Sequence, residues 1–132
     1  MIVLDTHALI WWVNKDDTRL SSVAADAIDQ ALAGDGVVAS SISAWELAML
    51  VSKGKLDLSI DVLTWLSVAS EIDGFSFVPV DNVIAVKSQT LPGDFHPDPA
   101  DRIIVALARE LGAELVTADR KIIGYPHVAT IW

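Results

Sequence analysis

The feature that most constrains the fold is a repeated alternation between short apolar runs and stretches with the spacing of helices. We predict strands over Ile2–Leu4, Val37–Ser40, Phe75–Val80, Glu114–Thr117 and His127–Ile131. We predict helices over Ala8–Val13, Ser22–Ala33, Ala44–Val51, Ile60–Glu71, Val83–Gln89 and Pro99–Leu111. Strands that alternate with helices are joined by right-handed crossovers. The sequence therefore predicts an α/β fold whose parallel sheet is covered by helices on both faces.

The size and composition of the chain narrow its class further. With 132 residues, we expect one domain, residues 1–132, built around a sizeable core. The sequence has no cysteine, which excludes disulfides and thiolate metal sites and fits a reducing cytosol. Charged residues interrupt each apolar run before the roughly 18 residues that a membrane span needs. No basic segment precedes the first apolar run, so we expect a cytoplasmic protein without a membrane partner.

The charge balance argues against a generally basic nucleic-acid-binding surface. The chain has 9 Lys and Arg residues against 18 Asp and Glu residues, a formal net charge of -9. Nucleic-acid binding depends on cationic contacts to phosphates. Any binding of RNA therefore requires a local source of positive charge.

Acidic residues follow two of the predicted strands and stand in the first turns of two predicted helices whose N-termini lie at the same edge of the sheet. The four residues are Asp5, Glu46, Asp101 and Asp119. Taken one by one, Asp5 and Asp119 fit as helix N-caps, and Glu46 lies three residues after Ser43, the spacing of a capping box. Asp101 occupies the third position of its predicted helix, where its side chain is too short to close such a box. Ligands bind beyond the carboxyl ends of parallel strands, so we expect all four carboxylates at one edge of the sheet.

Four carboxylates placed together repel one another unless a cation joins them. All-oxygen ligands without thiolates select a hard ion, so we expect Mg²⁺ or Mn²⁺. Such an ion activates a bound water and neutralises charge on phosphoryl oxygens. The pattern therefore predicts hydrolysis of a phosphate ester.

The motifs VLDTHALIWW, SISAWELAMLVSKGKL, DPADRIIVALA and LVTADRKI resemble the successive acidic motifs of PIN domains, in particular VapC-type toxins. The resemblance covers essentially the whole chain. It implies a three-layer α/β/α sandwich around a central, mostly parallel five-stranded sheet. It also implies a Mg²⁺- or Mn²⁺-dependent endoribonuclease that leaves a 5′-phosphate and a 3′-hydroxyl, forms homodimers and is held silent by a cognate antitoxin.

The resemblance also assigns roles to individual residues. The catalytic and metal-binding acids are Asp5, Glu46, Asp101 and Asp119, with Glu46 as a further ligand or as the base that orients the attacking water. Thr117 matches the hydroxyl position beside the last acid, and Thr6 is also placed to hydrogen-bond the carboxylates. Asp98 matches an extra acid found in part of the family, although the position also suits a helix N-cap.

Basic and aromatic residues carry the expectations about partners. We predict that Arg102, Arg120 and Lys121, which adjoin the acidic motifs, bind RNA, although Arg102 also fits an ion pair with a neighbouring acid. Lys53 and Lys55 follow the helix of Glu46 and are expected farther from the site.

The tryptophans and histidines receive mostly structural assignments. Trp11 and Trp12 are adjacent on a predicted helix, so we expect one of them to be exposed and to suit an antitoxin or a second subunit. We assign Trp45 and Trp65 to packing. We expect His7 to pack beside the first helix and His96 to lie in a loop, which leaves each a secondary candidate for acid-base catalysis.

Two alternatives remain open on the sequence. The first is another metal-dependent phosphohydrolase, such as an aspartyl-nucleophile phosphatase. That enzyme needs a second Asp two positions after the first, where this chain has His7. The second is a non-catalytic PIN fold that binds RNA or protein, against which the intact set of acids argues.

Overall fold

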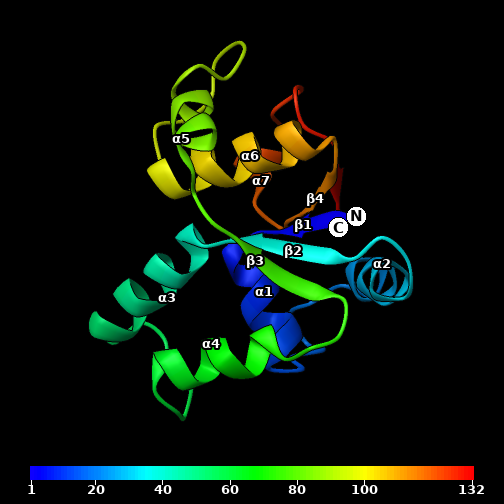
Figure 1. Cartoon of the computed structure of the whole chain (residues 1–132), viewed down its shortest axis with the longest axis vertical. Helices are drawn as coiled ribbons and strands as arrows, with labels where there is room; N and C mark the ends of the chain where they lie inside the picture. The colour runs from blue at the N-terminus through cyan, green and yellow to red at the C-terminus, as the bar shows by residue number, and fades with distance from the viewer.

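The structure, a computed structural model, describes all 132 residues and contains a central sheet of five parallel strands. The strands are β1 (Ile2–Leu4), β2 (Val37–Ser40), β3 (Phe75–Val78), β4 (Glu114–Val116) and β5 (Thr130–Ile131). Their order across the sheet is β3-β2-β1-β4-β5, so β1 is central (Figure 1). The chain first adds β2 and β3 on one side of β1, and then β4 and β5 on the other. The predicted parallel five-stranded sheet is confirmed.

Seven helices cover the two faces of the sheet. They are α1 (Thr6–Val13), α2 (Ser22–Ala33), α3 (Ile42–Ser52), α4 (Val62–Ser70), α5 (Asn82–Gln89), α6 (Pro99–Leu111) and α7 (Arg120–Ile123). The first four helices pack on one face, and α5, α6 and α7 pack on the other (Figure 1). This arrangement is the three-layer α/β/α sandwich. None of the helices combines the length and the apolar character that crossing a membrane requires.

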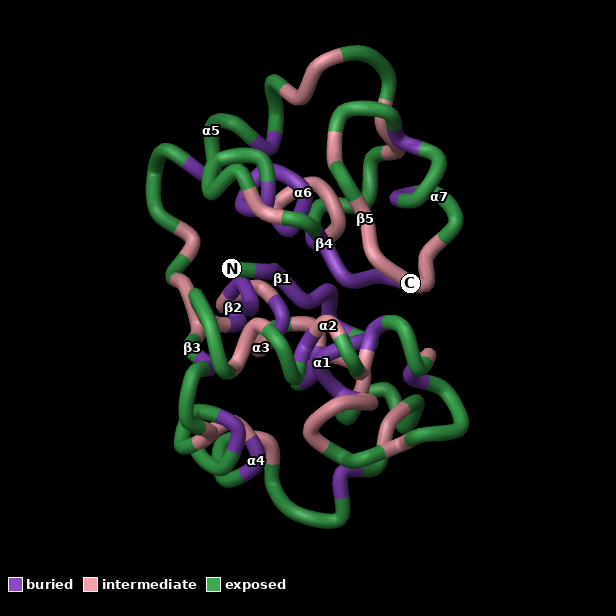
Figure 2. Tube along the Cα trace, turned by 90° about the vertical axis from the view of Figure 1, so that its right-hand side faces the viewer, coloured by how far each residue is buried: buried purple, intermediate pink, exposed green.

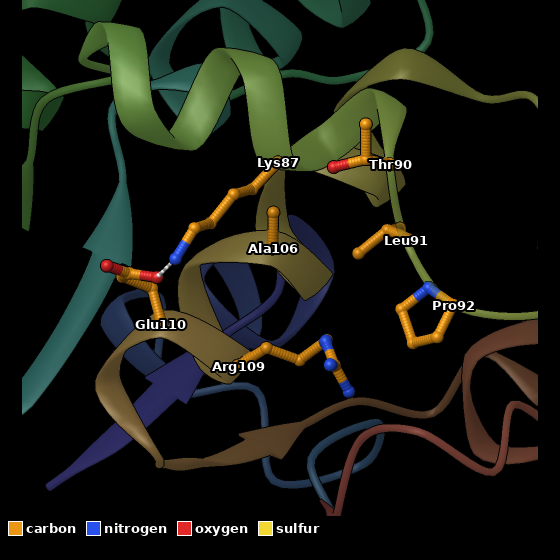
Figure 3. A pocket seen from close by; sticks show the side chains of 7 residues that line it. All are labelled: Lys87, Thr90, Leu91, Pro92, Ala106, Arg109 and Glu110. Carbon is orange, nitrogen blue, oxygen red and sulfur yellow. Dashed lines mark hydrogen bonds and ion pairs between the residues drawn. The ribbon is translucent and has the colours of Figure 1, made fainter.

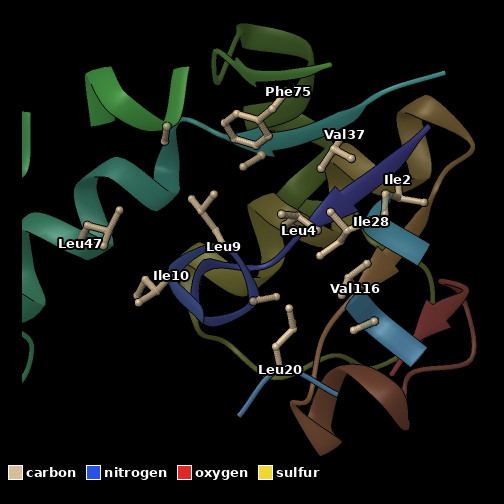
Figure 4. Packing of buried hydrophobic residues seen from close by; sticks show 14 of the residues in the cluster. Ile2, Leu4, Leu9, Ile10, Leu20, Ile28, Val37, Leu47, Phe75 and Val116 are labelled. Atoms are coloured by element: carbon tan, nitrogen blue, oxygen red, sulfur yellow. The ribbon is translucent and has the colours of Figure 1, made fainter. Parts of the chain in front are cut away.

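The two cores follow from the alternation of side chains along the strands. Ile2 and Leu4 of β1 point into a core shared with α1 and α2, whereas Val3 points into the core beneath α6. Figure 4 shows the first of these cores, in which Leu4, Leu9 and Ile28 come together from a strand and two helices. Because both faces are covered, the central strands are buried along their length (Figure 2).

The ends of several elements differ from the sequence-based boundaries for local reasons. β3 ends at Val78 because Pro79 cannot donate a ladder hydrogen bond. α1 begins at Thr6 rather than Ala8, because Asp5 acts as its N-cap. α4 begins at Val62 rather than Ile60, since the Asp61 side chain caps its first turn. β5 covers only Thr130–Ile131, two residues of the five predicted.

The topology creates a crevice at the carboxyl end of the sheet. The crossover from β1 runs to β2, whereas β4 lies on the opposite side of β1. In open parallel sheets, ligands bind where the direction of the connections reverses in this way. The segments that leave β1 and β4 carry Asp5 and Asp119 to that point.

Candidate metal centre

Asp5 leaves the central strand and is buried at 7% exposure. Its Oδ1 accepts a hydrogen bond of 2.8 Å from the amide of Ala8, so it does cap α1. Burial raises the pKa of this carboxyl above its ordinary value, against the opposing effect of the Thr117 hydroxyl and the Ala8 amide. Asp5 is therefore both a cap and an acid held rigidly at the centre of the sheet edge.

Glu46 reaches the same region from α3. One of its carboxylate oxygens accepts a hydrogen bond from the hydroxyl of Thr6. The same Thr6 hydroxyl lies 2.8 Å from the hydroxyl of Ser43. Ser43 is within α3 and not at its N-cap, so the capping box is not formed. Burial raises the pKa of Glu46, and the carboxylates of Asp98 and Asp5 add to the effect.

Asp101 projects from the first turn of α6. The Asp98 side chain caps this helix by accepting a 3.0 Å hydrogen bond from the amide of Asp101. Burial, followed by repulsion from Asp98, Asp119, Glu46 and Asp5, raises the pKa of Asp101 to about 7. Such a value means that the Asp101 carboxyl is protonated in part near neutral pH.

Asp119 lies on the other side of β1, directly after β4. Its Oδ1 accepts a hydrogen bond of 2.8 Å from the amide of Lys121 and caps the short helix α7. Its own amide donates a 3.0 Å bond to the hydroxyl of Thr117, a residue without exposed surface. Thr117 therefore fixes the backbone that presents Asp119.

These acids meet in one cavity of about 470 Å³. Its lining includes Asp5, Glu46, Asp98, Asp101 and Asp119, together with Thr6, His7, Trp11 and Ala118. No lysine or arginine lines it. The joint placement expected from the sequence is thus present, with Asp98 beside the other four.

The chemistry of these donors fits a hard divalent cation. Five carboxylates supply oxygen ligands, and a cation among them offsets the burial and the mutual repulsion that raise the pKa of Asp101. In the present rotamers, however, no three of the acidic or histidine side chains lie close enough to hold one ion. Glu46 is turned toward Thr6, and Asp101 lies 3.2 Å from Nε2 of His96. Binding an ion therefore requires carboxylates to rotate toward the cavity.

The predicted RNA-binding residues are placed differently from one another. The guanidinium of Arg102 donates to the carbonyl oxygens of Ser88, Phe95 and His96 at 2.8, 2.9 and 3.3 Å, which ties the loop before α6 to the end of α5. Its hydrogen bonds are those of a structural residue, and it forms no ion pair. Arg120 and Lys121 are exposed at the start of α7, beside the cavity but outside its lining.

The aromatic assignments need two corrections. Trp11 and Trp12 are both half-buried, and Trp45 is the exposed tryptophan at 59%. Trp45 precedes Glu46 on α3, so when Glu46 turns toward the cavity Trp45 points about 100° away from it. Trp65 is buried as predicted. His7 is exposed and lines the cavity, and its ring packs against Trp11 of α1, as expected. His96 lies in a loop, also as expected.

A separate cavity of about 260 Å³ lies between α5 and α6. Its charged groups already have partners: Lys87 pairs with Glu110 (Figure 3). Arg109 donates to the carbonyl oxygen of His127. It contains none of the acids of the sheet edge. We therefore place the chemistry in the acidic cavity.

The family model described as PIN domain matches residues 2–128. This chain belongs to the PIN-domain family. The model spans all four acidic segments of the cavity, from Asp5 to Asp119. The resemblance inferred from the motifs is thereby confirmed.

Relatives of this PIN domain match it almost end to end. Ribonuclease VapC22 of Mycobacterium tuberculosis (strain ATCC 25618 / H37Rv) is 37% identical over 133 residues, which cover 99% of this chain and 98% of that protein. The crystal structure of VapBC2 from Rickettsia felis, bound to a DNA fragment from their promoter, matches with a TM-score of 0.71 at 20% identity, covering 98% and 97% of the two chains. A toxin-antitoxin complex from Klebsiella pneumoniae matches with a TM-score of 0.59, 20% identity and the same coverage. These solved structures support the fold.

Proposed function

We propose that this protein is a divalent-metal-dependent endoribonuclease and the toxin of a toxin-antitoxin pair. The observation that carries the proposal is the convergence of carboxylates from four separate segments in one cavity of a PIN domain. The 37% identity to a protein named as a ribonuclease supports RNA as the substrate.

Within this proposal, Asp5, Asp101 and Asp119 hold Mg²⁺ or Mn²⁺. Once bound, the ion activates a water molecule and neutralises charge on the phosphate. Glu46 joins them as a ligand or accepts the proton of the attacking water. Thr6 and Thr117 orient these groups, through the Glu46 side chain and the Asp119 backbone respectively. Attack at phosphorus breaks the bond to the 3′ oxygen and leaves a 5′-phosphate and a 3′-hydroxyl.

The proposal extends to the partners of the protein. A cognate antitoxin holds the enzyme silent, and two copies form a homodimer in the cytoplasm. The fold shared with a toxin-antitoxin complex supports the first of these statements. RNA approaches the acidic cavity past Arg120 and Lys121, the exposed cations nearest to Asp119 along the chain.

The decisive experiment is cleavage-site mapping on total cellular RNA with the purified protein. We expect cleavage with Mg²⁺ or Mn²⁺, none with EDTA and none with the variant Asp5→Asn. The variant Asp26→Asn, which removes an exposed carboxylate of α2 outside the cavity, is the matched control and should cleave normally.

Two other outcomes would replace the proposal. Hydrolysis of a phosphomonoester without cleavage of RNA would favour another metal-dependent phosphohydrolase. Retention of cell toxicity by Asp5→Asn would favour a non-catalytic module that acts by binding. In either case the acidic cavity would need a different assignment.

A further inference from the structure

The acidic cavity adjoins a second cavity of about 280 Å³, and the two share a wall. The shared residues are His7 and Trp11, both from α1. The second cavity continues over the turn after α1 and the segment after α3, where Arg19 and Lys55 line it. A ligand that leaves the carboxylates in this direction must pass the Trp11 ring.

Trp11 is half-buried: part of its side chain packs against the core, and part lines the two cavities. The ring centroids of His7 and Trp132 lie 5.7 Å from that of Trp11, with interplanar angles of 47° and 57°. Neither neighbour therefore lies flat against the indole. Trp12 is a contrasting case, because it packs against Phe75 at 5.3 Å and lines neither cavity.

The two cavities also differ in the charges of the residues that line them. The acidic cavity has no lysine or arginine, whereas the second has two cations and two acids in its lining. Those acids already accept hydrogen bonds within their own turns, Asp16 from Thr18 and Asp57 from Ser59. Lys55 is exposed and forms no ion pair. It is therefore an unpaired cation in the cavity that Trp11 also lines.

We propose that Trp11 is a stacking platform for an RNA base next to the scissile phosphate, and that Lys55 binds the phosphate that follows. This inference rests on the proposed ribonuclease function and deepens it by giving the substrate a direction across the surface. Stacking on an aromatic ring tolerates every base, and it suits an unpaired strand whose bases are free to turn outward. The proposed site therefore favours single-stranded RNA.

The test compares two 12-nucleotide oligonucleotides, a single-stranded RNA of mixed sequence and a chain of the same length made of stable abasic analogues. Binding is measured with Ca²⁺ in place of Mg²⁺, and gel electrophoresis checks that the RNA stays intact. We expect the wild type to prefer the RNA by about five-fold to a hundred-fold, the range of one stacked base. Trp11→Ala should lose this preference, and Trp11→Phe should keep most of it. Trp45→Ala, at an exposed tryptophan outside both cavities, should keep all of it.

A second pair of variants tests the phosphate contact and does not depend on the folding of Trp11→Ala. Lys55→Gln should weaken binding of both oligonucleotides equally and reduce the slope of log affinity against log salt by about 0.7. Lys53→Gln makes the same change of charge two residues away, outside the cavity, and should leave that slope nearly unchanged.

The outcomes separate this inference from the proposed activity. Equal preference for RNA in the wild type and Trp11→Ala, or equal salt slopes in the two lysine variants, would overturn the platform even if the enzyme cuts RNA. A Trp11-dependent preference for RNA over the abasic chain, without metal-dependent cleavage, would support the stacking platform and overturn the proposed nuclease activity. Failure of the wild type to bind RNA at all would overturn both.

Discussion

At the scale of single residues, the acids of the cavity have two roles at once. Asp5, Asp98 and Asp119 each cap a helix by accepting an amide hydrogen bond, and each also lines the cavity. Capping and ligation are therefore not competing explanations at these positions. The cap fixes the backbone and uses one oxygen of each carboxylate, while the side chain still lines the cavity.

The raised pKa of Asp101 predicts how the metal-free protein responds to pH. Folding raises the pKa of this carboxyl from 3.8 to about 7. The contribution of the protonated carboxyl to stability is therefore complete at pH values below 3.8, and it is lost as the pH rises through about 7. Asp101→Asn removes the ionisation, so we expect it to be more stable than the wild type at pH 8 in EDTA. Screening of this partly exposed group limits the gain to about 1–2 kcal/mol.

Thermal unfolding of both proteins between pH 4 and pH 8 measures the effect. The difference in Tm should grow with pH and be smallest at pH 4, where the Asp101 carboxyl is protonated in the native state and ionised only in part in the unfolded state. Asp26→Asn is the control, since its carboxylate lies outside the cavity. A constant difference across the pH range would show that folding does not raise the pKa of Asp101.

The contact between Thr6 and Glu46 yields a second prediction at this scale. Thr6→Val keeps the shape of the side chain but removes the donor to Glu46 and the partner of the Ser43 hydroxyl. We expect RNA cleavage to fall about 10-fold to 100-fold, as when a group that orients a metal ligand is lost. Thr6→Ser should restore most of the rate. Rates for Thr6→Val equal to the wild type would show that Glu46 needs no orientation from α1.

At the scale of elements, variants of Asp98, the N-cap of α6, separate the contribution of its capping hydrogen bond from that of its charge. Asp98→Asn keeps a side chain that caps equally well, whereas Asp98→Ala does not. We expect Asp98→Ala to lose about 1 kcal/mol of unfolding free energy and Asp98→Asn to lose little. Chemical denaturation measures both. Cleavage should survive in Asp98→Asn, and its loss would promote Asp98 to a required ligand.

Most elements could be predicted from the sequence because the signals are local. The apolar run Ile2–Leu4, the cap at Asp98 and the Pro99 that follows it each identify an element without reference to the rest of the chain. The extent of β5 could not be predicted, since only its two hydrogen-bonded residues pair with β4 and the apolar pattern continues outside them. The exposure of Trp45 also escaped prediction, because it depends on which side of α3 meets the sheet.

At the scale of the whole molecule, the edge at which the acids meet could be inferred from topology alone, because parallel strands bring their carboxyl ends together. The state of the individual side chains could not. The turn of Glu46 toward Thr6 and the engagement of Arg102 with three carbonyl oxygens depend on contacts between distant segments. Because Arg102 follows Asp101, the sequence alone predicts that it binds RNA. In the structure its hydrogen bonds hold the loop before α6.

The acidity of the whole chain shapes the last prediction. With a net charge of -9, the protein gains stability from any salt that screens its repulsion, so a divalent ion must be tested at constant ionic strength. Under that condition we expect Mg²⁺ or Mn²⁺ at 100 times its Kd to stabilise the wild type by about 2.7 kcal/mol. Differential scanning calorimetry should record this as a rise in Tm that Asp5→Asn loses and Asp26→Asn keeps. Equal rises in all three proteins would place the bound ions on the general acidic surface and leave the cavity without a metal.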